Sequence, residues 1–287
     1  MKRSTASILL FFFWFLAEWV AANSAVAGGR FNIAGLQDET LRKNARQSTG
    51  LYAYRDREVS AAQVRRLYEN APDEIREALE PFGYYGATVE GELTQSNSDW
   101  IARFTVHLGP SVKVRDINIA FEGPGADDKV SFELREHFPL QIGDRLVHSQ
   151  YERGKAAVQS ALEGHGYLQA QLHTSRVDVY TENNAADIVL HWDTGVRYKM
   201  GETRFEGAQF PDEFMRRFVQ HQKGDYYDSD ALLKLQRRLI DADYFGFVSV
   251  SPDLQDAQGN VVPITVQVAP APRRGGGAKA RRAAAGP

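Results

Sequence analysis

The sequence predicts an α+β fold of three tandem β-α-α-β-β domains, each a three-stranded sheet with helices on one face. Three observations predict it. Short motifs return at intervals of about 80 residues, alternating apolar and polar residues mark strands, and amphipathic helical stretches follow the first strand of each repeat. The length of 287 residues, with 43% hydrophobic and 25% charged residues, suits a folded chain of several small domains.

The repeat is defined by motifs that recur in the same order along the chain. They are Phe121-Glu122-Gly123 and Phe205-Glu206-Gly207, Gly143-Asp144 and Gly224-Asp225, and Gly83-Tyr84 and Gly166-Tyr167. Asp243-Tyr244-Phe245-Gly246 is a weaker third copy of the last motif. This spacing predicts domains at residues 28–112, 113–197 and 198–272.

Each repeat opens with a strand, and helices follow it. The expected first strands are Arg30–Ile33, Val114–Phe121 and Glu202–Phe205. Because proline is favoured in the first turn of a helix, Pro72 predicts a fresh helix start near Asn70. The other helices are expected over Gln150–Glu163 with Ser149 as N-cap, and over Ala231–Ala242 with Asp228 or Ser229 as N-cap.

Two strands joined by a polar turn close each repeat. The expected pairs are Thr88–Leu93 with Ile101–Leu108, Ala170–Tyr180 with Ala186–Trp192, and Phe247–Leu254 with Val261–Val268. Tyr84, Tyr167 and Tyr244 stand at equivalent helix-to-strand junctions, which predicts that they pack the helix end on the sheet. Linkers between repeats are almost absent, so we expect semi-rigid joints.

The N-terminus has the pattern of a secretory signal peptide. Lys2 and Arg3 precede an apolar run, and Ala25-Val26-Ala27 forms a small-residue cleavage site. Residues 1–27 are therefore expected to be removed by cleavage between Ala27 and Gly28. The alternative is a membrane anchor, but Glu18 interrupts the apolar run well before the roughly 20 residues that a spanning helix needs.

No combination of residues predicts catalysis, a cofactor or a metal site, and we expect that the chain is not an enzyme. The seven histidines form no helical metal-binding pair. Helix capping explains the acidic run Asp225–Asp230, and a plain turn explains Gly123–Asp127. The absence of cysteine excludes disulfides and thiolate sites. Residues 28–272 carry 27 basic and 36 acidic side chains, a net charge of −9, which disfavours nucleic acid as a partner. A secreted hydrolase is a distant alternative.

Sheet edges offer a different kind of site. An edge strand exposes unpaired backbone groups, to which an extended segment of another protein can add as a further strand. The strand after the helices of each repeat is the candidate edge. The candidate binding residues are Thr88, Val89 and Gly91 in the first repeat, Ala170, Gln171, Leu172 and His173 in the second, and Phe247, Val248 and Val250 in the third.

The signal peptide, the three repeats and the stretch Ala71–Tyr85 together resemble the POTRA-domain region of TamA-like outer-membrane assembly proteins, in the BamA/TamA superfamily. The resemblance covers about residues 30–272. It implies a periplasmic region that assists the assembly of outer-membrane proteins or autotransporters by β-augmentation and partner docking. The implied partners are a TamB-like, inner-membrane-anchored protein and unfolded outer-membrane proteins.

The chain departs from this family at its C-terminal end. The family carries an outer-membrane β-barrel, whereas residues 273–287 form a basic, low-complexity stretch that is expected to be disordered. We expect a chain truncated before its barrel by a shifted reading frame or an early stop. The alternative is an autonomous soluble periplasmic binding or chaperone protein built of the same domains.

Overall fold

A computed structural model describes residues 25–26, 28–96 and 99–271. Ala27 of the expected cleavage site, most of the expected signal peptide and the basic tail at 273–287 lie outside the described residues. Contacts group the chain into two compact units. One comprises residues 1–117, 140–152 and 177–187, and the other comprises residues 118–139, 153–176 and 188–287.

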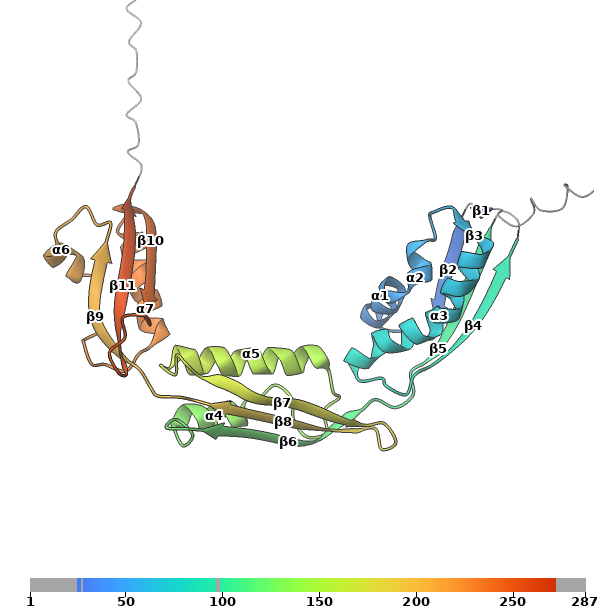
Figure 1. Ribbon diagram of the computed structural model, residues 1–287, viewed down its shortest axis with the longest axis horizontal. Coiled ribbons are helices and arrows are strands. Elements are labelled where there is room, and N and C mark those ends of the chain that lie inside the picture. Colours follow the sequence, from blue (N-terminus) through green and yellow to red (C-terminus); the bar gives the residue numbers. More distant parts are fainter. Residues whose placement is uncertain (1–24, 27, 97–98, 272–287) are drawn as a thin grey trace, which may run out of the picture. The chain divides into compact units, whose positions relative to one another are not determined.

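The described residues include three three-stranded sheets with helices between their strands, which confirms the α+β class (Figure 1). The strand orders are β2 (Gly29–Ala34), β5 (Trp100–His107), β4 (Thr88–Gln95); β6 (Lys113–Glu122), β8 (Ala185–Asp193), β7 (Gln171–Tyr180); and β10 (Phe245–Pro252), β11 (Val261–Pro270), β9 (Lys199–Glu206). We call them the first, second and third repeat. In the first and third, the opening strand runs parallel to the central strand, and the other pair is an antiparallel hairpin.

The helices of the first repeat are α1 (Glu39–Ser48), α2 (Gly50–Ala53) and α3 (Ala61–Leu79), followed by the 3₁₀ turn η1 (Glu80–Phe82). The predicted helix start near Asn70 is wrong, because Pro72 lies inside α3. Ser60 caps α3 by accepting a hydrogen bond from the Gln63 N–H. A buried stripe then runs through the proline, and its packing outweighs the lost helical hydrogen bond. The stripe comprises Val64, Ala71, Ile75 and Leu79.

The later repeats contain α4 (Lys129–Glu136), α5 (His148–Gly164), α6 (Asp212–Arg216) and α7 (Ser229–Asp241). The expected N-cap at Ser149 is wrong, since α5 begins one residue earlier and includes Ser149. The cap at Asp228 is confirmed, because its carboxylate accepts from the Asp230 N–H at 2.9 Å. Within the described residues, none of these helices has the length and apolar composition required to cross a membrane.

The central strands and the helices form the cores. On β5 alternate residues from Trp100 to Val106 are buried, and on β11 Val262, Ile264 and Val266 are fully buried. The glycine of the Phe-Glu-Gly motif matters for this packing. A Cβ on Gly207 would lie 2.3 Å from the Val268 carbonyl oxygen. In the first repeat Ile33-Ala34-Gly35 takes the place of this motif, and a Cβ on Gly35 would lie 2.0 Å from the Val106 carbonyl oxygen. Glycine at these positions therefore lets the first strand end close against the central strand.

Candidate functional site

The three candidate strands all lie at sheet edges. β4, β7 and β10 each have one neighbouring strand in the described sheets, as do β2, β6 and β9 on the opposite sides. An edge position leaves backbone N–H and C=O groups available for a further strand. The three edges differ in what their side chains and backbone groups already contact.

On β4, Thr88 is exposed and Val89 is half-buried. Gly91 lies beneath a helix side chain, because a Cβ there would be 2.7 Å from the Tyr68 hydroxyl oxygen. Glu92, also on β4, faces solvent and lies 3.7 Å from the Arg103 guanidinium on β5. Burial raises the pKa of Tyr68, and the nearby Glu92 carboxylate adds to that rise. The β4 edge strand therefore carries charged side chains, at Glu90 and Glu92.

In the second repeat, Gln171 and His173 are exposed on β7, and Leu172 is half-buried. Ala170 was expected in the strand but precedes it and is buried. Its N–H donates to the Tyr167 carbonyl at 3.0 Å, and its carbonyl accepts from Gln159 Nε2 at 2.9 Å. Both backbone groups of Ala170 are thus already bonded, so this residue offers no site for an incoming strand.

In the third repeat, Phe247 is 55% exposed on β10, whereas Val248 is buried and Val250 is half-buried. The register shifts between Phe245 and Phe247, which marks a bulge. The Val248 carbonyl accepts from Gln236 Nε2 on α7 at 3.2 Å. The strand Phe245–Pro252 contains no charged residue. It is the least protected edge of the three, because charge on edge strands is a usual defence against strand addition.

A second recurring feature is the joint that links one repeat to the next. In the first joint, the Val112 N–H donates to the Gly83 carbonyl at 2.8 Å, and the Val112 carbonyl accepts from the Leu146 N–H at 2.9 Å. The Val114 N–H then donates to the Asp144 carbonyl at 2.8 Å. The Gly-Tyr motif of one repeat and the Gly-Asp motif of the next are thereby held together by backbone hydrogen bonds.

The second joint repeats this arrangement atom for atom. The Tyr198 N–H donates to the Gly166 carbonyl at 2.7 Å, and the Tyr198 carbonyl accepts from the Tyr227 N–H at 3.0 Å. The Met200 N–H donates to the Asp225 carbonyl at 2.8 Å. The sequence motifs alone did not indicate this role, since each motif is one half of a contact whose other half lies in a different repeat.

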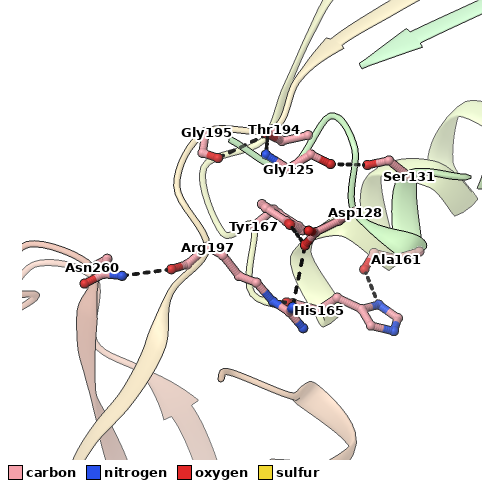
Figure 2. Close-up of polar contacts among 10 residues, drawn as sticks. All are labelled: Gly125, Asp128, Ser131, Ala161, His165, Tyr167, Thr194, Gly195, Arg197 and Asn260. Carbon is pink, nitrogen blue, oxygen red and sulfur yellow. Dashed lines mark hydrogen bonds and ion pairs between the residues drawn. The ribbon is translucent and has the colours of Figure 1, made fainter. Parts of the chain in front are cut away.

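Side chains reinforce both joints. In the first, Arg145 Nη1 donates to the Tyr84 hydroxyl at 2.7 Å. In the second, shown in Figure 2, the Tyr167 hydroxyl donates to Asp128, and Arg197 Nη1 lies 3.6 Å from the same carboxylate. Burial, together with the hydrogen bond to Asp128, raises the pKa of Tyr167. Tyr84 packs against the first core, as expected. An arginine also lies over each ring, with Arg145 at 5.3 Å from the Tyr84 centroid and Arg197 at 5.9 Å from the Tyr167 centroid.

The remaining polar groups have structural roles. The Gly125 N–H in the loop Gly123–Asp127 donates to Thr194 Oγ1 at 3.0 Å (Figure 2). The Asp225 carboxylate accepts from the Gln222 N–H at 2.8 Å, so it closes a turn. Within the described ranges, no group of three His, Asp or Glu side chains is placed to hold a metal ion.

Comparison with known proteins identifies two of the three repeats at the level of sequence. Residues 30–108 match the family described as POTRA domain TamA domain 1, and residues 198–271 match the POTRA family described as Surface antigen variable number repeat.

Several solved structures also match this chain at low identity. Haemophilus influenzae BamA POTRA3-5 is 19% identical, with a TM-score of 0.48 over 87% of this chain and 99% of that one. BamA from Haemophilus ducreyi lacking POTRA domains 1-3 is 19% identical, with a TM-score of 0.47 over 55% of this chain and 29% of that one. POTRA1-3 of Omp85 from Anabaena is 16% identical, with a TM-score of 0.32 over 87% and 96%.

Proposed function

Because this chain carries tandem POTRA domains, the first of the TamA domain 1 kind, we propose that it is the periplasmic region of a TamA-like translocation and assembly module subunit. In this proposal it assists the assembly of outer-membrane proteins or autotransporters. It holds unfolded segments by β-augmentation and docks a TamB-like, inner-membrane-anchored partner. The family match over residues 30–108 supports the TamA assignment.

The exposed edges support β-augmentation as the binding mode. Backbone hydrogen bonds supply affinity with little demand on the sequence of the added strand, and pockets for alternate side chains supply preference. Unfolded outer-membrane proteins are chains of such segments, with apolar and polar residues in alternation. Edge strands can therefore hold many different clients of this class.

The observation that carries this proposal is the uncharged edge β10. Its strand combines the 55% exposed Phe247 with neutral neighbours at Ser249 and Ser251. The third repeat also exposes apolar side chains elsewhere, at Leu233 and Ile240 of α7 and at Tyr244. An alternating apolar segment added to β10 would cover Phe247 without burying a charge, whereas addition to β4 would bring it against Glu92.

The test uses the full chain and a fluorescent synthetic peptide of about ten residues that alternates Val and Ser. Phe247→Lys and Ser249→Lys place charge on the edge, and each should weaken binding by about tenfold or more, which corresponds to about 1.4 kcal/mol. Thr88→Lys on β4 is the matched control and should leave binding within about twofold. Equal binding by all variants, measured by fluorescence anisotropy, would contradict the assignment of β10.

We also propose that the protein is periplasmic, with a mature chain that begins at Gly28. The strand β1 (Ala25–Val26) pairs with β3 (Val59–Ser60), so cleavage after Ala27 removes this pairing. Mass spectrometry of the protein from a periplasmic fraction should give the mass of residues 28–287. A chain that keeps residues 1–27, or that stays in the cytoplasmic fraction, would refute this part of the proposal.

A further inference from the structure

The third copy of the Gly-Tyr motif has the conformation of the first two. Asp243 has φ +57°, in the left-handed region that Gly83 and Gly166 occupy with φ +85° and +99°. Its N–H donates to the Ile240 carbonyl at 3.1 Å, just as the N–H of Gly166 donates to the Glu163 carbonyl at 3.1 Å. A left-handed residue is a common helix end, so the conformation alone explains only how α7 stops.

The difference lies in what the motif contacts. The carbonyls of Gly83 and Gly166 accept the N–H groups of Val112 and Tyr198 in the joints. Among the described residues, no donor bonds the Asp243 carbonyl. Tyr244 is 45% exposed, whereas Tyr167 at the equivalent position is 1% exposed. The third repeat thus presents the acceptor and the tyrosine of a joint without the matching half.

The exposed ring of Tyr244 is held in place by three phenylalanines. Its ring packs edge-on against Phe210, Phe214 and Phe245, with ring centroids at 5.2, 5.7 and 6.3 Å. Ile240 precedes Tyr244 by four residues and is 52% exposed. Packing of this kind fixes the orientation of an aromatic ring before any partner arrives, which lowers the entropic cost of docking.

We propose that this end of the third repeat, defined by Asp243, Tyr244 and Ile240, is an open joint half that docks a further module of the same repeat. The incoming module would enter by its first strand and its Gly-Asp turn. The occupied joints define its chemistry. A buried apolar residue like Val112 or Tyr198 donates its N–H to the open carbonyl, and an arginine lies over the tyrosine ring. This surface is separate from the β10 edge and does not depend on the proposed function.

One residue of the chain departs from the joint pattern. Gly109 and Gly195, where the chain leaves the first two repeats, have φ of +66° and +61°. Ala271 stands at the equivalent position in the third repeat, three residues after Val268 as Gly109 is three residues after Val106. Ala271 does not share the positive φ, since the only described non-glycine residues that have one are Asn184 and Asp243. The Ala271 N–H instead lies 3.4 Å from the Tyr244 carbonyl. Docking of a covalently continuous module should therefore be stronger with glycine at this position.

The experiment extends the full chain by inserting a second copy of residues 195–270 after Pro270. The inserted Gly195 then stands in place of Ala271, and the inserted Tyr198 stands at the joint position. Residue-resolved hydrogen exchange should protect the inserted Tyr198 N–H within about threefold of the original. Hydroxyl-radical oxidation of Tyr244 should fall towards that of Tyr167. Restoring alanine at the inserted Gly195 should weaken docking about 5- to 30-fold.

Two variants make the result decisive. In the extended chain, Tyr244→Ala should remove protection of the inserted Tyr198 N–H, whereas Phe247→Ala, on the neighbouring exposed surface, should leave it unchanged. The proposal is overturned if Tyr244 is oxidised equally in both chains while the inserted copies of Val262 and Ile264 are protected, because the inserted module is then folded and undocked. Peptide binding at β10 is measured separately, so either proposal can fail alone.

Discussion

The joint between the first and second repeats gives a sharp prediction about two glycines. Gly83 and Gly143 both have left-handed backbones, with φ of +85° and +92°. A Cβ on Gly83 would lie 2.6 Å from the Leu146 carbonyl oxygen, whereas a Cβ on Gly143 would meet no atom within 4 Å. The alanine variants at these positions therefore share the backbone cost and differ in crowding at the joint.

The magnitudes follow from those two terms. Alanine in the left-handed region costs about 1–2 kcal/mol, which is the whole effect expected for Gly143→Ala. Gly83→Ala adds the cost of overpacking against backbone, typically about 1–3 kcal/mol, for a total of about 2–5 kcal/mol. The excess should appear at the joint, because the Cβ pushes Leu146 away from Val112.

Native-state hydrogen exchange of the full chain is the suitable assay, since a chain of several domains does not unfold in one step. The reporters are the N–H groups of Val112 and Leu146, which bond across the joint at 2.8 and 2.9 Å. Gly83→Ala should speed their exchange by about 5- to 150-fold more than Gly143→Ala does. Equal exchange in the two variants would refute the view that the close contact at Gly83 holds the joint.

Three further predictions concern the core and two titrating groups. Phe104 is 1% exposed on β5, and Phe104→Ala should lower the free energy of unfolding by about 3–5 kcal/mol. Urea unfolding followed by NMR should show this loss in the first repeat and not in the third. Burial lowers the pKa of His221, whose Nε2 lies 2.9 Å from Thr203 Oγ1. The folded state then binds fewer protons than the unfolded state, so the free energy of unfolding should fall as the pH drops below about 6.5. His221→Gln should remove that dependence in urea titrations at pH 7.5 and 5.5. Burial and the hydrogen bond to Asp128 raise the pKa of Tyr167, so the folded state keeps a proton that the unfolded state loses at high pH. The second joint should therefore weaken as the pH rises above about 10. Tyr167→Phe should abolish this alkaline loss, and an unchanged pH profile in that variant would contradict the prediction.

Local patterns were enough to predict the strands. Alternation on β5 and β11 reflects burial of one face, and that pattern is written in consecutive residues such as Phe104 and Val106. The helices were harder, because Pro72 favours a helix start locally and only the tertiary packing of Ala71 and Ile75 keeps α3 continuous. The prediction of Ala170 as a strand residue was wrong for a similar reason, because Gln159 on the preceding helix donates a hydrogen bond to the Ala170 carbonyl.

The joints could not be derived from the sequence, although their residues belong to its recurring motifs. Gly166 and Tyr198 meet through backbone atoms, and a backbone hydrogen bond leaves no side-chain pattern to detect. The recurrence of Gly-Tyr and Gly-Asp at a common spacing was the available signal. It showed that these positions matter, but the contact between the two motifs required coordinates. The edge residues stay predictions, because an edge position permits binding without identifying what binds.

Main-chain bonding at the joints also has an evolutionary consequence. Since the contacts at Gly83 and Gly166 are made largely by peptide groups, most neighbouring side chains can diverge without breaking them. Only the glycines and a few polar residues are constrained, which fits the faint similarity among the repeats. A gene segment that encodes one whole repeat carries half of a joint at each end. Duplication or loss of such a segment would leave compatible ends, so arrays of this kind can change length without redesign of their neighbours.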